Sequence, residues 1–112
     1  MPAGTGPELV FAVDIGSFTD KGFSATSTFD GRQVTLEFDY GDQGISLTKA
    51  MASRLRVSKG SLVSLIVEDD RVESSELKVA DVGDELRVSD EKTYSAVGRG
   101  GGAVIRIRKA PS

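Results

Sequence analysis

Four residue types are missing from this 112-residue sequence: cysteine, histidine, tryptophan and asparagine. Without cysteine the chain cannot form a disulfide, bind zinc through thiolates or use a thiol nucleophile. Without histidine it lacks the commonest general base and the commonest transition-metal ligand of proteins. These absences argue against many classes of enzyme, so we expect a non-enzymatic protein with no cofactor and no metal site.

Glutamine and methionine are also scarce, with Gln33, Gln43, Met1 and Met51 the only examples. Low counts of Asn, Gln, Cys and Met are typical of proteins that work at high temperature. In a chain this short the same counts also arise by chance. A thermophilic source is therefore one of two interpretations of the composition.

Long hydrophobic runs are absent as well. No segment approaches the length of a membrane span, and residues 1–7 lack the basic flank and apolar stretch of a signal peptide. We therefore expect a cytoplasmic protein that does not bind membranes. The length suits one domain, predicted over residues 8–109, with a flexible lead at 1–7 and a tail at 110–112.

The clearest local pattern is a β-hairpin centred on Asp30 and Gly31. This pair favours a two-residue turn in which both residues take positive φ. The following segment, residues 32–40, alternates apolar and polar side chains. Its apolar face comprises Val34, Leu36, Phe38 and Tyr40. Such alternation predicts a half-buried antiparallel strand.

One helix is predicted, over residues 47–55, with Ser46 or Thr48 as its N-cap. Its apolar stripe comprises Leu47, Ala50, Met51 and Leu55. Further strands are expected at residues 8–13, 18–29, 62–67, 72–80, 85–88, 93–97 and 103–108, with a glycine-rich hairpin tip at 98–102. The predicted fold class is mostly β with one helix, arranged as a small antiparallel barrel or sandwich in a single domain.

Charge is distributed unevenly along the chain. Residues 68–91 contain ten acidic and three basic side chains, whereas residues 92–112 contain five basic ones and no acid. Opposite charges in adjoining segments can pair across neighbouring strands, and they can also form surfaces for self-association or for a charged protein partner. The candidate partner-binding residues are Arg99, Arg106, Arg108, Lys109, Glu68, Asp69 and Asp70.

Two glycine-containing segments are candidate phosphate sites. Asp14 and Gly16, followed by Lys21, resemble the first phosphate-binding turn of actin-like ATPases, but a chain of 112 residues is too short for that two-lobed fold. Residues 98–102 lack the Lys-Ser/Thr pair of a phosphate loop and precede a strand. A plain turn and a hairpin tip are the favoured interpretations.

Residues 44–72 resemble the AbrB-like swapped-hairpin motif. The stretch begins at Gly44, continues through the predicted helix, a turn at Gly60 and a strand, and ends after an acidic turn at Val72. The resemblance implies a homo-oligomer of interlocked hairpins. Many members of that family bind DNA, which would assign phosphate contacts here to Lys49, Arg54, Arg56 and Lys59.

The sequence departs from this family at the positions on which DNA binding depends. Thr48 stands where the family usually has proline, and Asp39, Asp42 and Gln43 stand where it has basic residues. Carboxylates there would repel phosphate. By its size, composition and lack of catalytic residues, the whole chain also resembles the arcadins, small accessory proteins of archaeal actin-like cytoskeletons. We therefore expect a protein-interaction or assembly module, with a DNA-binding regulator as the alternative.

Overall fold

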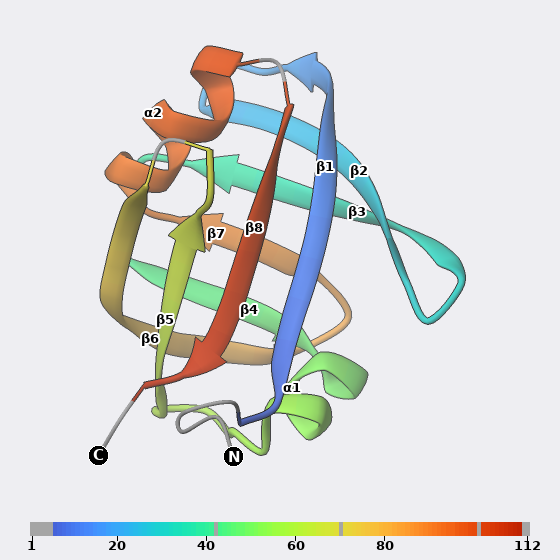
Figure 1. Cartoon of the computed structure of the whole chain (residues 1–112), viewed down its shortest axis with the longest axis vertical. Helices are drawn as coiled ribbons and strands as arrows, with labels where there is room; N and C mark the ends of the chain where they lie inside the picture. The colour runs from blue at the N-terminus through green and yellow to red at the C-terminus, as the bar shows by residue number, and fades with distance from the viewer. Residues whose placement is uncertain (1–5, 42, 70, 101, 111–112) are drawn as a thin grey trace.

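The structure, a computed structural model, describes residues 6–41, 43–69, 71–100 and 102–110. Within them, eight strands form a closed barrel, with α1 near one end and α2 at the other (Figure 1). In chain order the elements are β1 (Glu8–Phe18), β2 (Gly22–Phe29), β3 (Arg32–Asp39), β4 (Gly44–Thr48), α1 (Lys49–Leu55), β5 (Leu62–Val67), β6 (Val72–Gly83), β7 (Leu86–Ser89), α2 (Glu91–Gly100) and β8 (Gly102–Lys109).

The strands follow the order β1-β2-β3-β7-β4-β6-β5-β8 around the barrel, and β8 closes it against β1. The prediction of a mostly β fold is confirmed, and of the two predicted arrangements the chain adopts the barrel and not the sandwich. The expected antiparallel arrangement is wrong at two contacts, because β3 pairs parallel with β7 and β4 pairs parallel with β6. These contacts join strands that are distant in the sequence, so no local pattern specifies them.

Apolar and polar residues alternate along the strands, and the apolar side chains, aliphatic and aromatic, fill the barrel interior. In β3, Leu36 and Phe38 point inward and are almost fully buried, as predicted, whereas Tyr40 lies just beyond the strand and is exposed. The largest fully buried side chains are Phe11, Phe23, Phe38, Leu9, Leu36, Ile45, Leu47, Met51, Leu55, Leu65, Leu77 and Leu86. Each contributes roughly 1.5–3 kcal/mol to folding when it leaves water.

The β2–β3 hairpin forms as predicted. Asp30 has φ 50° and Gly31 has φ 80°, so both turn residues occupy the left-handed region that this turn requires. The two strands pair in register from Phe29 opposite Arg32 to Gly22 opposite Asp39. The local sequence therefore determines this part of the fold.

The predicted helix is present as α1, but it starts at Lys49. Thr48 is its N-cap, and its side-chain oxygen accepts a hydrogen bond from the Met51 amide at 3.3 Å. Leu47 belongs to β4 and is buried there. The helix buries Met51, Ala52 and Leu55, whereas Ala50, predicted in the apolar stripe, is exposed. The buried stripe of α1 therefore includes Ala52 in place of Ala50.

A second helix, α2, replaces the predicted strand at residues 93–97 and most of the predicted glycine-rich hairpin tip. Asp90 precedes it, and its carboxylate accepts hydrogen bonds from the Thr93 amide at 3.1 Å and the Thr93 hydroxyl at 2.7 Å. This cap starts a helix whose buried face consists of Thr93, Ala96 and Val97. Capping and packing on the barrel outweigh the strand propensity of Thr, Tyr and Val.

Gly98 has a packing role in α2. A Cβ at this position would lie 3.2 Å from Cε2 of Phe23. A glycine here therefore lets the helix approach the Phe23 ring, although glycine disfavours helix interiors. This is why a glycine-rich segment that suggests a loop belongs to a helix in the folded protein.

Candidate interaction surfaces

A row of aromatic rings lies beneath α2 at one end of the barrel. Phe18 contacts Phe23 with 5.7 Å between ring centroids, and Phe23 contacts Tyr94 of α2 at 5.1 Å. Tyr94 then meets Tyr40 edge-on at 5.1 Å. The inner rings are held by the core, but the two outer ones are exposed, Phe18 by 69% and Tyr40 by 55%. We call these four residues the aromatic rim.

A hollow of about 520 Å³ adjoins Tyr40, where β3 and β7 end and β4 begins. Its walls include Lys21, Gly41, Gln43, Ser46, Ala80 and Ser89. Concave sites with a mixture of apolar and polar groups are typical places for a ligand or an anchoring side chain. The exposed Tyr40 ring therefore stands beside a space that a partner's side chain can enter.

Asp39 fixes the wall of this hollow. Its carboxylate accepts hydrogen bonds from the Gly41 amide at 3.0 Å and from the Arg87 guanidinium at 3.1 Å. Burial opposes ionisation, but the hydrogen bonds from Gly41, Ser89 and Arg87 outweigh it, so the pKa of Asp39 lies below its ordinary value of 3.8. Hydrogen bonds to Glu85 and then to Asp39 raise the pKa of Arg87. The pair stays charged at neutral pH.

A second hollow, of about 680 Å³, lies along the start of α2. It is lined by Gln43, Val72, Asp90, Glu91, Lys92, Ser95 and Arg99. Asp90 itself is 4% exposed and also accepts a hydrogen bond from the Ser74 hydroxyl at 2.5 Å. Asp90 therefore ties α2 to β6, and Arg99 lies on α2 instead of at the predicted hairpin tip.

Of the other predicted partner-binding residues, some form ion pairs within the chain and others are exposed. Arg106 on β8 pairs with Glu8 at 3.1 Å and with Glu68, and Arg108 pairs with Glu8 at 3.2 Å. Among the described residues, only the contact of Glu68 with Arg106 joins the acidic segment 68–91 to the basic segment 92–112, because Glu8 belongs to neither. Lys109 and Asp69 are exposed, and Asp70 lies outside the described residues.

The four basic residues that would contact DNA under the alternative also differ in their surroundings. Arg54 binds both carboxylate oxygens of Asp30, at 2.7 and 2.9 Å, and its guanidinium lies 5.1 Å from the centre of the Phe29 ring. Lys49, Arg56 and Lys59 are exposed. Arg54 therefore serves to join α1 to the hairpin tip.

Two further findings concern the described ranges only. No group of three or more acidic side chains in them could hold a metal ion, and no helix formed by them is long and apolar enough to cross a membrane. Every buried side-chain nitrogen or oxygen atom there has a hydrogen-bond partner. The hydrogen bonds of the buried polar side chains in this part of the chain are therefore made within the folded chain.

The aromatic rim was missed by sequence reasoning. Phe18 and Tyr94 fall in predicted strands, at residues 18–29 and 93–97, and Tyr40 was placed on the apolar face of the strand at residues 32–40. Only the fold brings β1, β2, β3 and α2 together there. A usable signal existed in Tyr40, because an aromatic residue directly before Gly41 lies at a strand end, where burial is incomplete.

Comparison with known proteins gives no relative. No family model matches the chain, and neither a curated protein nor a solved structure matches it. Any functional argument must therefore come from the residues of this chain.

Proposed function

We propose that this chain is a non-enzymatic protein-interaction module that binds a partner polypeptide at the aromatic rim. The observation that carries the proposal is the pair of exposed rings, Phe18 and Tyr40, at the ends of a row whose inner rings are fixed in the core. Tyrosine and phenylalanine are enriched at the centres of protein interfaces. A ring that is already held in place loses little entropy on binding.

The hollow beside Tyr40 supports a peptide-like partner. Its lining combines the apolar or aromatic residues Tyr40, Ile45 and Ala80 with the basic residue Lys21. An apolar side chain of the partner would fill the hollow, and a neighbouring backbone carbonyl or carboxylate would face Lys21. Interfaces of this kind place an apolar anchor in a pocket with a polar edge.

Selection of random peptides displayed on phage tests this proposal. Peptides selected on the full chain should carry an apolar anchor, and binding should be lost when Phe18→Ser and Tyr40→Ser are combined. The matched control combines Val10→Ser and Leu62→Ser, which removes two exposed apolar side chains elsewhere on the barrel. Equal binding to both variants, or no enrichment at all, would contradict the proposal.

The resemblance to arcadins stays a prediction, in which the partner would be a cytoskeletal filament. The DNA-binding alternative also stays a prediction. It is favoured by the exposure of Lys49, Arg56 and Lys59 and weakened by the engagement of Arg54 with Asp30. Fluorescence anisotropy with labelled duplex DNA at about 50 and about 200 mM salt tests it, because binding through several phosphates weakens steeply over that range. We expect no binding at either concentration.

A further inference from the structure

Strand β5 lies between β6 and β8 in the barrel wall (Figure 1) and points every second side chain out of the barrel. The outward side chains are Leu62, Ser64 and Ile66. Leu62 is 43% exposed, and the other two are partly buried. We call these three residues the β5 ridge. The ridge is an uncharged line of short or aliphatic side chains along the outside of the wall.

Oppositely charged strands flank the β5 ridge. On one side, β8 places Arg106 opposite Ile66. The next outward pair along the same two strands is Arg108 opposite Ser64. On the other side, β6 places Glu73 opposite Ile66. The ridge therefore has a basic flank on β8 and an acidic flank on β6.

A bulge in β6 adds a second acid to the acidic flank. The register between β5 and β6 shifts between Val63 and Leu65. Within this shift, Ser75 and Glu76 of β6 lie beside the single residue Ser64, and both are exposed. Two successive rows across the wall therefore run from an arginine, through an uncharged ridge residue, to a glutamate.

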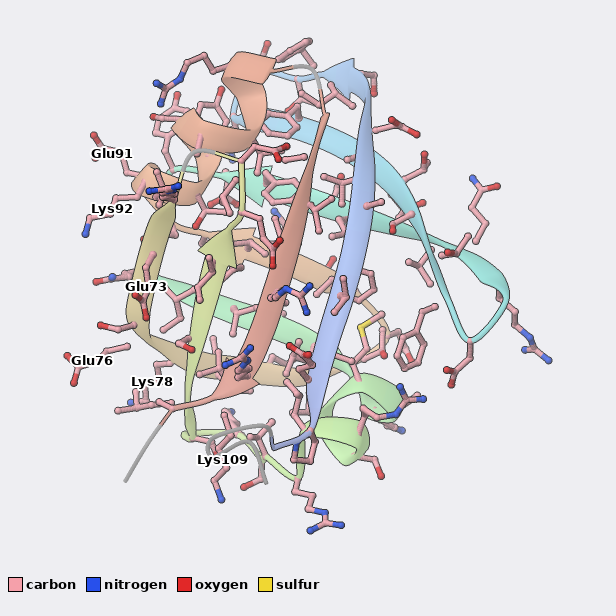
Figure 2. The ribbon with its side chains drawn as sticks, viewed as in Figure 1. Glu73, Glu76, Lys78, Glu91, Lys92 and Lys109 are labelled. Atoms are coloured by element: carbon pink, nitrogen blue, oxygen red, sulfur yellow. The ribbon has the colours of Figure 1, made fainter. Side chains whose placement is uncertain are left out.

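The acidic flank has no counter-charge in the described part of the chain. Glu73 and Glu76 are exposed, and neither forms an ion pair there. Figure 2 shows both along the left-hand side of the barrel, on the outside of the wall. Two carboxylates that are fixed on a strand and lack a counter-charge are open to a basic surface of another molecule.

The basic flank keeps hydrogen-bond donors for such an acid. Arg106 binds Glu8 through Nη1 and Glu68 through Nε. Arg108 binds Glu8 through Nε. A guanidinium carries five N–H donors. Within the described ranges, Nη2 of Arg106 and both Nη atoms of Arg108 therefore have no acceptor, and the two side chains are about one-third exposed, at 33% and 38%.

We propose that two copies of this chain dimerise wall to wall, with their β5 ridges in contact and a two-fold axis along the ridge. This axis sets β8 of each copy against β6 of the other, so the basic flank meets the acidic flank twice. Arg106 then faces the partner's Glu73, and Arg108 faces the partner's Glu76. Complementary charges of this kind fix the register of an interface and disfavour wrong partners.

The shape of the wall agrees with this arrangement. The outer surface of a closed barrel is convex, so two walls touch along one line and separate on either side of it. The short side chains of the β5 ridge lie on that line. The long side chains of arginine and glutamate lie on the flanks, where they can reach across the wider gap.

Charge also selects the direction of the two-fold axis. An axis across the strands at Ser64 would set Arg108 against the same arginine of the partner, and Glu76 against the same glutamate. Like charges placed opposite each other oppose association. With the axis along the ridge, Lys78, which lies beside Leu62 on β6, faces the uncharged Ala110, whose amide binds the Leu62 carbonyl at 2.9 Å.

Sedimentation equilibrium of the full chain between about 10 µM and about 1 mM measures this dimer directly. Glu73→Lys sets a like charge against Arg106 at two places and should weaken dimerisation about tenfold or more. Glu91→Lys, which makes the same charge change at an exposed position of α2, is the matched control. Lys78→Gln should change the dissociation constant by less than about threefold, because Lys78 faces no acid of the partner.

The ridge itself is tested by Ile66→Ser, which removes an apolar side chain from the line of contact and should weaken the dimer about tenfold. Val10→Ser is the matched control, because Val10 points outward from the same wall but lies on β1, two strands from β5. It should leave dimerisation unchanged.

Thermal unfolding followed by circular dichroism establishes that each variant is folded. A monomer throughout the concentration range would overturn the proposal. So would a dimer that Glu73→Lys or Ile66→Ser leaves intact, since its interface would lie elsewhere. Loss of the dimer in Lys78→Gln would overturn the direction of the two-fold axis. None of the four rings of the aromatic rim takes part, so this proposal and peptide binding at the rim succeed or fail separately.

Discussion

The barrel wall made of β1, β8 and β5 differs from strand β6 in how it uses charged residues. On the wall, Glu8 and Glu68 hold Arg106 and Arg108, so the charges are neutralised within the chain. On β6, Glu73, Glu76 and Lys78 remain exposed to solvent. The difference follows from the cross-strand neighbours. Glu8 lies opposite Arg108, whereas Glu73 and Lys78 lie opposite the uncharged Ile66 and Leu62 of β5.

The largest expected effect comes from Asp90, the carboxylate that fastens α2 to β6. Asp90→Ala removes the acceptor for Ser74 and Thr93 and leaves buried hydroxyl and amide groups without a partner. We expect a loss of about 3 kcal/mol in the free energy of unfolding, measured by urea denaturation. Glu91→Ala, one residue along and exposed, should cost less than about 0.5 kcal/mol. Equal effects would show that the cap does not hold α2.

The second effect concerns Asp39, whose charge is used inside the chain like those of the β1–β8–β5 wall. Asp39→Asn should lower the free energy of unfolding by about 1 kcal/mol at pH 7, because Arg87 is partly exposed and the interaction is screened. The folded-state pKa of Asp39 is below 3.8, so its ionised form stabilises the fold above that pH.

This contribution disappears as pH falls through the folded-state pKa. The difference between wild type and Asp39→Asn should therefore shrink when urea denaturation is repeated at about pH 3 and below. A difference that stays constant with pH would mean that the loss arises from altered packing and not from the charge.

The smallest effect distinguishes the two regions most sharply. Glu8→Gln removes the partner of two arginines and should cost about 1 kcal/mol, whereas Glu73→Gln should change the stability of the dilute protein by less than about 0.5 kcal/mol. Both substitutions remove one negative charge, so net charge is matched. If Glu73→Gln were the more costly in dilute solution, Glu73 would have a role within the subunit.

Local signals predicted the parts of the fold that local chemistry determines. Asp30 and Gly31 specify a turn with positive φ, and the Thr48 side chain caps a helix, so both features followed from short stretches. Pairing between the acidic and basic segments was one of two interpretations, and one contact of this kind, between Glu68 and Arg106, is present.

The rest depends on contacts between distant residues. Residues 93–97 favour a strand by composition, but Asp90, Ser74 and the barrel end make them helical. The parallel pairing of β3 with β7 follows from the path of the whole chain. The aromatic rim is a product of that path, which is why it did not appear in the sequence as a site.

The most direct test of the account is a titration of amide NMR spectra with a peptide selected on the full chain. The account predicts that the amide signals of Phe18, Tyr40 and Tyr94 in the aromatic rim shift as the peptide is added, while those of Arg106 and Arg108 on β8 stay in place. Shifts centred on β8, or no change at the aromatic rim, would contradict it.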